Sequence, residues 1–475
     1  MGYSDLGCFG GEINTPNIDA LADNGIRFTQ FYNTAKCMSS RACLLTGLYA
    51  QQCGMDRQPV AMKNSATLGE VLREAGYRTF ASGKHHGTEN LYERGFDHYY
   101  GLRDGGCNYW NPGEQREGEP KPGNKGRLRY WCDDSITFAP FTPKDKNFYT
   151  TDAFTTKALE WLDEKELEQQ PFFLYLAYQA PHYPLHAWPE DITKYEGRYD
   201  AGYEAIRKTR YDRMADLGII DPEKAPLPQM MDTKWSELSD EERAKEIKRM
   251  EIYAAMLDRA DQNIGRIIAK LKVQGKLDNT LIMFASDNGA CAEMPNVKNR
   301  STAIEDFGTV ASYEVVGKEW ATVQNTPLRY WKNYTQEGGI CTPFIVSWPK
   351  GIKTRGVISQ EYGHFIDIMP TLVELTGAKY PEEQNGEKVI PMQGISLVPA
   401  FEGKELTRNE PLYWQWSKGG GIRKDDMKAV FWGDNWEFHN IKADRNESVN
   451  LAEQNPDLFE EMKQKWNEWN NRVRN

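Results

Sequence analysis

The chain has 475 residues, of which 39% are hydrophobic and 27% charged, a composition typical of a folded globular protein with room for a large domain and a smaller one. Its formal net charge of −11 argues against binding to nucleic acid or to anionic membranes, because both need a basic surface. No stretch reaches the roughly 20 apolar residues of a bilayer-spanning helix, so the sequence predicts no membrane partner.

Two short helices are predicted near the start of the chain. Thr15 is a candidate N-cap, and a proline at the first helical position begins a run that ends at Gly25. Thr67 and Glu70 have the spacing of a capping box, and Gly76 ends the second helix.

Four near-continuous apolar runs further along are typical of strands buried on both faces. They cover residues 78–87, 171–184, 279–289 and 341–349. Helical patterns lie between them at 151–167, from Ser239 onward, and at 251–275. Strands that alternate with helices favour an α/β fold with a large, mostly parallel mixed sheet flanked by helices.

The pattern changes after about residue 403. The segments "PLYWQW", "MKAVFWG" and "WEFHNI" predict short antiparallel strands, and a helix is expected over about 455–472. We therefore expect a main α/β domain over 1–403 and a small antiparallel subdomain with a terminal helix over 404–475. Residues 110–128 are rich in proline, glycine and charge and are predicted to form an exposed insertion loop.

Polar side chains follow three of the predicted strands. These are Lys84, His85 and His86 after the first, His182 after the second, and Asp287 and Asn288 after the third. A single such residue is more often just hydrogen-bonded or solvated. Ligands of doubly wound sheets, however, bind beyond the carboxyl ends of the strands, so three polar strand ends in one sheet predict a functional site.

The residue types at these strand ends indicate a chemistry. The side-chain oxygens of Asp287 and Asn288 suit a hard cation such as Ca²⁺ or Mg²⁺, although "SDNG" alone also fits a simple turn. Lysines and histidines aimed at the same point describe a pocket for a tetrahedral oxyanion with a group for proton transfer. The sequence thus predicts transfer of a sulfuryl or phosphoryl group.

Cys37, in "AKCMSSRACLLTG", stands at the start of a predicted helix. The N–H groups of a helix N-terminus bind anions and activate a thiol, but a small buried residue is an equally simple explanation. The eight cysteines contain no C-x-x-C pair, which argues against a zinc ribbon or a thioredoxin-like motif. A bridge between Cys107 and Cys132 stays open.

A series of motifs, in order along the chain, resembles those of the type I sulfatases, which belong to the alkaline-phosphatase-like superfamily. "CMSSRACLLTG" is similar to their C-x-P-x-R signature, with Ser39 where proline or alanine is usual. "SGKHHG", "APHYPLHA", "FASDNGA" and "NTPLRYWKNYTQEGG" resemble their lysine, histidine and metal motifs. "HFIDIMPTLVELTG", "MQGISLVPAFEG" and "EFHNIKADRNESVNL" extend the similarity over essentially the whole chain, as in the bacterial arylsulfatase-like branch.

The resemblance implies a role for each candidate residue. Cys37 would be oxidised by a formylglycine-generating maturase, and its hydrated aldehyde would attack sulfur. Arg41 would steady that group, and Lys84 and Lys332 would bind sulfate oxygens. His182 would protonate the departing alcohol, and His86 would be the base that expels sulfate. Asp287 and Asn288 would hold Ca²⁺. The expected activity is sulfuric ester hydrolysis of a sulfated small molecule or oligosaccharide.

One departure from the family concerns the start of the chain. Family members carry a strand ending in two adjacent metal-binding aspartates directly before the stretch that here begins with Met1 as "MGYSDLG". Either the chain is a piece of a longer protein or its start is misassigned. If the strand is truly absent, we expect weak metal binding, low activity and exposed sheet edges. The family also implies a periplasmic or extracellular location, although the sequence shows no secretion signal.

Two other functions stay open. A phosphomonoester or phosphodiester hydrolase of the same superfamily would favour two metals, for which a chain with seven histidines offers few extra ligands. A catalytically dead sugar-binding protein would fit the absent aspartates and the aromatic content of 12%.

Overall fold

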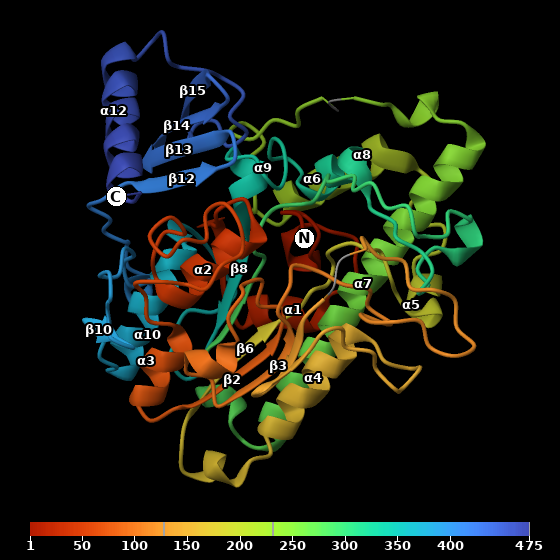
Figure 1. The fold of residues 1–475 in the computed structure, drawn as a ribbon. Coiled ribbons are helices and arrows are strands. Elements are labelled where there is room, and N and C mark those ends of the chain that lie inside the picture. Colours follow the sequence, from red (N-terminus) through yellow and green to blue (C-terminus); the bar gives the residue numbers. More distant parts are fainter. Residues whose placement is uncertain (127–128, 230–231, 475) are drawn as a thin grey trace.

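The structure is a computed structural model that describes residues 1–126, 129–229 and 232–474. Two mixed sheets form its centre, with α2, α3 and α10 on one side and α4 and α7 on the other (Figure 1). The helices are α1 (Pro16–Asp23), α2 (Cys37–Thr46), α3 (Leu68–Glu74), α4 (Thr150–Trp161), α5 (Pro189–Thr193), α6 (Gly202–Asp216), α7 (Asp240–Val273), α8 (Gly317–Gln324), α9 (Glu337–Ile340), α10 (Ile368–Thr376), α11 (Val398–Phe401) and α12 (Pro456–Arg472). Mixed sheets flanked by helices confirm the predicted α/β class.

The nine strands of these sheets form two groups. The five-stranded sheet has the order β5 (Ile136–Phe138), β4 (Trp131–Asp133), β3 (His98–Leu102), β2 (Arg78–Gly83) and β6 (Phe172–Ala177). The four-stranded sheet has the order β7 (Ile282–Ala285), β8 (Cys341–Ser347), β1 (Gly25–Tyr32) and β9 (Val357–His364). β2 is parallel to β3 and β6, and β1 is parallel to β9, whereas β8 is antiparallel to β1 and β7.

The four predicted strands are present as β2, β6, β7 and β8. β1 was missed because it begins at Gly25, the residue predicted to end the helix before it. β6 and β7 each have a strand neighbour on one side only among the described residues, and their apolar side chains are largely half-buried. β6 and β7 are therefore edge strands of the described sheets.

The predicted helices agree with the structure, with one merger. The capping box of Thr67 and Glu70 is formed at α3. The segments predicted from Ser239 and over 251–275 are one 34-residue helix, α7, whose N-cap Ser239 accepts from the backbone of Glu242. α7 packs against α1, α4 and α5. Its buried residues begin at Met250, so packing of its later part stabilises a helix whose first turns are charged.

The C-terminal module contains β12 (Leu412–Trp416), β13 (Gly419–Lys424), β14 (Met427–Trp432) and β15 (Asn435–Asn440), with α12 packed against them. It lies beside the main body in Figure 1. β13 was not predicted, because it begins with three glycines, which weaken a strand pattern. The boundary near residue 403 stays a prediction. A short hairpin, β10 (Glu383–Gln384) and β11 (Glu387–Lys388), completes the strands of the described residues.

Buried ion pairs join this module to the main body. Lys428 on β14 donates to Glu337 on α9 at 2.8 Å and to Glu447 at 2.7 Å, and all three side chains are fully buried. Arg445 also pairs with Glu337. Because each carboxylate has a cationic partner, the module is attached at the segment that follows Lys332.

The Cys107–Cys132 bridge that the sequence leaves open is absent, since both cysteines are free. Cys107 Sγ lies 3.2 Å from Gln179 Oε1, and Cys132 Sγ lies 3.8 Å from Thr137 Oγ1, so the two thiols contact different partners. Of the predicted loop 110–128, residues 127–128 lie outside the described residues. Its first residue is anchored, with Trp110 4.6 Å from the ring of Trp188, while residues 114–118 are largely exposed.

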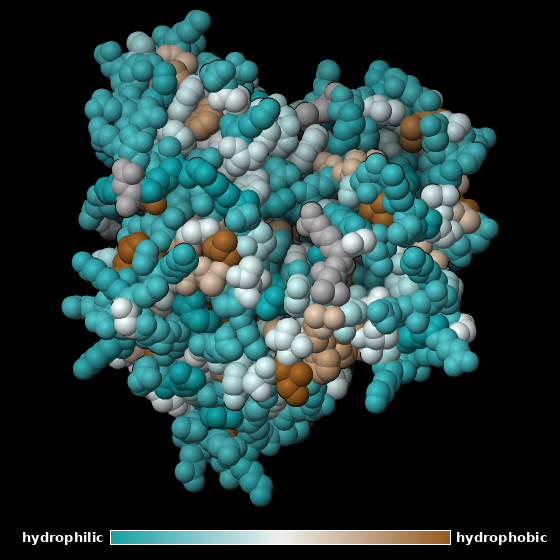
Figure 2. Space-filling model, in the orientation of Figure 1, coloured by the Kyte–Doolittle hydropathy of each residue, from teal (hydrophilic) through white to brown (hydrophobic). Residues whose placement is uncertain are grey.

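Among the described helices, none is long and apolar enough to cross a membrane. The face shown in Figure 2 is largely hydrophilic, with apolar residues scattered over it.

Candidate active site

Cys37 is the first residue of α2 and is 1% exposed. The chain enters the helix through Ala35, whose φ of +62° is unusual for a residue with a side chain, and through the extended Lys36. Cys37 Sγ lies 3.1 Å from Nδ1 of His86. The thiol therefore sits at a helix N-terminus, where backbone N–H groups favour negative charge, with an imidazole in contact.

Lys84 and His86 follow the end of β2 and lie near Cys37. Gly83 has φ +119°, and a Cβ there would lie 2.1 Å from the carbonyl oxygen of Ala177 on β6, so only glycine allows the two strands this approach. Lys84 is 2% exposed, and its N–H donates to the same carbonyl at 2.7 Å. His86 adopts φ +70°, a strained conformation typical of functional sites.

His85, predicted with its neighbours, does not join the site. It is buried, and its Nε2 lies 3.5 Å from Oε1 of Glu89. Successive side chains of an extended chain point to opposite sides, so the side chain of His85 points away from that of His86.

Arg41, one turn after Cys37 on α2, connects the helix with both strand ends. Its Nε donates to Oδ2 of Asp287 at 2.8 Å, and another guanidinium nitrogen donates to the carbonyl of Lys84 at 2.5 Å. The hydroxyl of Tyr175 on β6 lies 3.3 Å from the same nitrogen. The guanidinium is thus fixed between the segments that carry Lys84 and Asp287.

His182 and Lys332 contact each other in the same site. Nδ1 of His182 lies 2.6 Å from the carbonyl of Tyr183, and Nε2 lies 3.2 Å from Nζ of Lys332. Because a carbonyl only accepts and an ammonium only donates, Nδ1 carries the proton and Nε2 accepts. Tyr330 and Asn333, with φ of +61° and +81°, flank Lys332, which is therefore held by a second strained segment.

The electrostatics of the pocket are dominated by cations. Burial, reinforced by Lys84 and Arg41, puts the pKa of His86 well below its ordinary value. Burial and the charges of Lys332 and Lys84 likewise lower the pKa of His182. Both imidazoles are therefore neutral in the resting protein, and the surplus of positive charge around them is suited to a bound oxyanion.

Asp287 and Asn288 follow β7 and supply oxygen atoms. Burial raises the pKa of Asp287, but Arg41 and Lys84 hold it well below its ordinary value, so the carboxylate is ionised. Asn288 is 4% exposed, and its Oδ1 has no hydrogen-bond partner. A buried acceptor without a donor is rare in proteins, and a cation would satisfy it.

These two residues fit a hard cation as part of its ligand set. The described residues contain no group of three or more His, Cys, Asp or Glu side chains that could hold a metal. Ca²⁺ takes six to eight oxygen ligands, so other donors are needed besides this turn.

The structure thus brings together Cys37, Arg41, Lys84, His86, His182, Lys332 and Asp287. Asn288 follows Asp287 directly in the chain. The structure also shows that Glu293, which no sequence pattern indicates, lies beside Lys332. Glu293 accepts from Lys332 at 3.0 Å and from Lys36 at 2.7 Å, and Asn333 and the Tyr183 hydroxyl also donate to it. A lone acid in "CAEMPN" gives no sequence signal, because its partners are distant in the chain.

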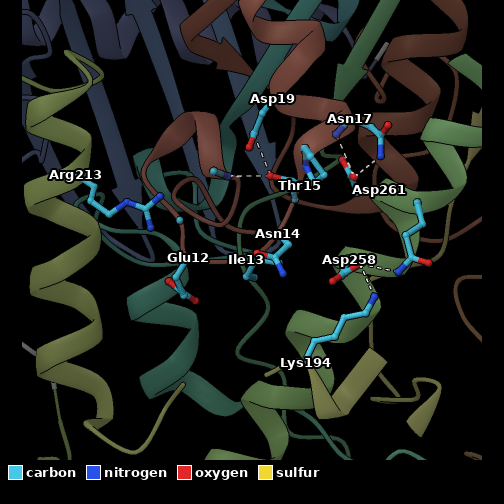
Figure 3. Close-up of a pocket in the computed structure, with 14 residues that line it drawn as sticks. Glu12, Ile13, Asn14, Thr15, Asn17, Asp19, Lys194, Arg213, Asp258 and Asp261 are labelled. Atoms are coloured by element: carbon cyan, nitrogen blue, oxygen red, sulfur yellow. Dashed lines mark hydrogen bonds and ion pairs between the residues drawn. The ribbon is translucent and has the colours of Figure 1, made fainter. Parts of the chain in front are cut away.

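A separate cavity of about 530 Å³ lies between α1 and α7 and contains none of these residues. Figure 3 shows that its carboxylates already have partners: Asp261 binds Asn17 at the start of α1, and Asp258 pairs with Lys194. These contacts are structural, so this cavity is not the candidate site.

Comparisons with known proteins identify chains of similar sequence and fold. The family model described as Sulfatase matches residues 1–378, and the model described as N-sulphoglucosamine sulphohydrolase, C-terminal, matches residues 329–472. The chain is 32% identical to an arylsulfatase of Klebsiella aerogenes over 87% of this chain and 92% of the relative. It is 26% identical to an N-acetylglucosamine-6-O-sulfatase of Bacteroides thetaiotaomicron, over 94% of this chain and 80% of the relative.

A solved structure of Ps i-CgsB in complex with k-i-k-neocarrahexaose has a similar fold. It superposes with a TM-score of 0.70 at 26% sequence identity, and the match covers 99% of this chain and 90% of that one.

Proposed function

The chain belongs to the sulfatase family, and from that premise we propose that it removes sulfate from a sulfated carbohydrate by means of a formylglycine derived from Cys37. As a family member it is a sulfuric ester hydrolase with the alkaline-phosphatase-like fold. This assignment favours sulfate over the phosphate esters and over the non-catalytic role that the sequence leaves open.

The observation that carries the proposal is the surrounding of Cys37. Its Sγ lies against His86 at 3.1 Å in the pocket that Arg41, Lys84 and Lys332 make positive. When oxidised to formylglycine and hydrated, the side chain would supply one hydroxyl to attack sulfur and a second to expel sulfate.

The three cations have different tasks. Arg41 is already engaged with Asp287 and the carbonyl of Lys84, so it steadies the residue at position 37 more than the substrate. Lys84 and Lys332 present ammonium groups on side chains of residues that are 2% and 1% exposed. They bind sulfate oxygens and stabilise the charge that develops on them in the transition state.

The two histidines handle protons at different atoms. His86 Nδ1 faces position 37 and, being neutral, takes a proton from the group there. His182 Nε2 faces Lys332, at the side where the alcohol departs. A bound sulfate ester adds negative charge to the pocket and raises the pKa of His182, which allows Nε2 to protonate the leaving oxygen.

We propose Ca²⁺ at Asp287 and Asn288, because an ionised carboxylate and a partnerless buried amide oxygen are the donors that this ion prefers. The ion would neutralise charge on a sulfate oxygen. Asp287 and Asn288 would hold the ion, and the hydrogen bond from Arg41 keeps Asp287 in place.

The substrate class rests on the relatives. The names of two similar proteins refer to a sulfated N-acetylglucosamine and to a bound neocarrahexaose. A formylglycine-generating maturase and a periplasmic or extracellular location belong to the same proposal.

The test compares turnover of 4-nitrophenyl sulfate and 4-nitrophenyl phosphate by protein coexpressed with a maturase, followed by a panel of sulfated mono- and oligosaccharides. We expect sulfate hydrolysis to dominate, with one group of sulfated sugars preferred over the aryl ester. Faster turnover of the phosphate would contradict the sulfatase assignment, and inertness toward every sulfated sugar would contradict the substrate class.

A further inference from the structure

Glu293 is an anion inside a pocket built for anions. Its carboxylate accepts from Lys332 Nζ at 3.0 Å and from Lys36 Nζ at 2.7 Å. The hydroxyl of Tyr183 and the amide of Asn333 donate to it at 2.8 and 3.2 Å, and the thiol of Cys291 lies 3.6 Å from its Oε2. Burial opposes its charge, but Lys332 and Lys36 hold its pKa well below the ordinary value. Glu293 therefore carries a fixed negative charge beside a lysine that is to bind sulfate.

Such a charge acts differently on different oxyanions. A sulfate monoester carries one negative charge, whereas inorganic sulfate and, above about pH 6, a phosphate monoester carry close to two. Coulomb energies scale with charge, so a fixed anion repels a dianion twice as strongly as a monoanion at the same place. The cations around Cys37 alone would favour the dianions, including the product.

We propose that Glu293 is a positioning and selectivity residue that offsets the charge of Lys332, so that the pocket prefers monoanionic sulfate esters and releases inorganic sulfate. The inference rests on the proposed function, because it assigns Lys332 to a sulfate oxygen. It concerns a residue that acts through Lys332 and makes no contact with the reacting atoms.

The contacts of Glu293 also fix the position of Lys332. The ammonium lies between the carboxylate and Nε2 of His182, at 3.0 and 3.2 Å. Lys36 is itself held over the ring of Trp416 at 5.5 Å, and the indole N–H of Trp416 donates to Asn333 at 3.1 Å. This arrangement keeps the counter-charge in place when a substrate enters.

Lys36 allows a second substitution whose expected effect on anion selectivity is opposite to that of changing Glu293. Its ammonium neutralises part of the charge of Glu293. Removing the carboxylate makes the pocket more positive, whereas removing Lys36 makes it more negative. Since neither side chain touches Cys37, His86 or His182 among the contacts of the described residues, the two changes should shift anion selectivity in opposite directions.

The experiment uses formylglycine-bearing wild type, Glu293→Gln, Glu293→Asp and Lys36→Met at pH 7.5. It measures kcat/KM for 4-nitrophenyl sulfate and 4-nitrophenyl phosphate, and the inhibition constants of inorganic sulfate and phosphate. For Glu293→Gln we expect the sulfate-to-phosphate ratio of kcat/KM to fall about tenfold and inorganic sulfate to inhibit about tenfold more tightly. Glu293→Asp should restore most of both values.

Lys36→Met should raise the sulfate-to-phosphate ratio, and Glu305→Gln, which changes an exposed carboxylate further along the same loop, should leave it unchanged. Equal loss on both substrates with an unchanged ratio would mark Glu293 as merely structural and overturn the proposal. So would unchanged inhibition constants. If the wild type cleaves no sulfate ester, the proposed function fails instead, and the dissociation constants of inorganic sulfate and phosphate for wild type and Glu293→Gln, measured by isothermal titration calorimetry, decide the role of Glu293.

Discussion

The imidazole of His182 accepts a hydrogen bond from Lys332 and donates one to the carbonyl of Tyr183. It is neutral in the resting protein because burial and nearby cations lower its pKa. Its protonation therefore depends on the charge of the bound ester. A residue of this kind matters most when the leaving group is a poor one, as an alcohol of a sugar is.

We accordingly expect His182→Ala to separate substrates by their leaving groups. Cleavage of a sulfated sugar should fall by about 10² to 10⁴-fold in kcat, whereas 4-nitrophenyl sulfate, whose phenolate leaves without a proton, should lose far less. Steady-state kinetics on both substrates checks this. An equal loss on both would show that His182 is not the proton donor.

At the residue scale, most of the site could be predicted from the sequence. Lys84, His182 and Asp287 can be recognised because each follows an apolar run typical of a strand, and Cys37 can be recognised by its motif. Glu293 could not be predicted, since its importance arises only from the approach of Lys36 and Lys332. His85 shows the converse: a polar residue in the right segment turns away from the site.

At the scale of elements, the close pairing of β2 with β6 positions two of the site residues. Gly83 ends β2 with its Cα against the carbonyl of Ala177, and the next residues are Lys84 and His86. The chain after β2 can be placed in the pocket only where no Cβ separates the strands.

Gly83→Ala should therefore displace Lys84 and His86, and we expect sulfatase activity to fall about 100-fold or more. Gly76→Ala is the matched control, because Gly76 has φ +88° and a methyl group added there would meet nothing within 4 Å. It should cost about 1 kcal/mol in stability and leave kcat unchanged. Equal activity of the two variants would refute the role given to the β2–β6 approach.

A second element-scale device is the buried ion network at α9. Lys428→Ala removes the cation between two fully buried carboxylates, Glu337 and Glu447, and should destabilise the protein by about 3–5 kcal/mol. Lys404→Ala, which breaks an exposed pair with Glu402, should have a far smaller effect. Thermal and urea unfolding measure both, and similar losses would contradict a special role for the network.

The elements themselves were predicted where a pattern is local. α3 and α12 have clear start signals, and β2, β6, β7 and β8 are apolar runs. β1 was missed because the helix before it hides it, and its pairing with β8, far along the chain, creates it. β13 was missed because of its glycines, although it pairs with its chain neighbours β12 and β14. The division of the strands into two sheets likewise depends on long-range pairing that no local pattern contains.

At the scale of the whole molecule, buried titratable groups make stability depend on pH. Burial lowers the pKa of His186 to about 4, and burial with Arg408 lowers that of His364 to about 3. Burial raises the pKa of Glu12 and Glu337, but their cationic partners lower both below the ordinary value. All four groups bind protons more readily in the unfolded chain.

Stability should therefore be fully present above the unfolded histidine pKa of about 6.5 and should decline below it, with a steeper loss below about pH 4.3 where unfolded glutamates bind protons. Melting temperatures measured from pH 8 to pH 4 check this course. A melting temperature that stays flat down to pH 5 would contradict the contribution of the two histidines.

The proposed sulfatase activity depends on the chemical state of residue 37. Protein coexpressed with a maturase at several ratios can be digested, and the fraction of Cys37 peptide that is about 18 Da lighter can be plotted against turnover of 4-nitrophenyl sulfate. We predict that activity rises in proportion to the lighter fraction and is absent in Cys37→Ala. Full activity with an unmodified thiol, or none after complete conversion, would contradict the central claim.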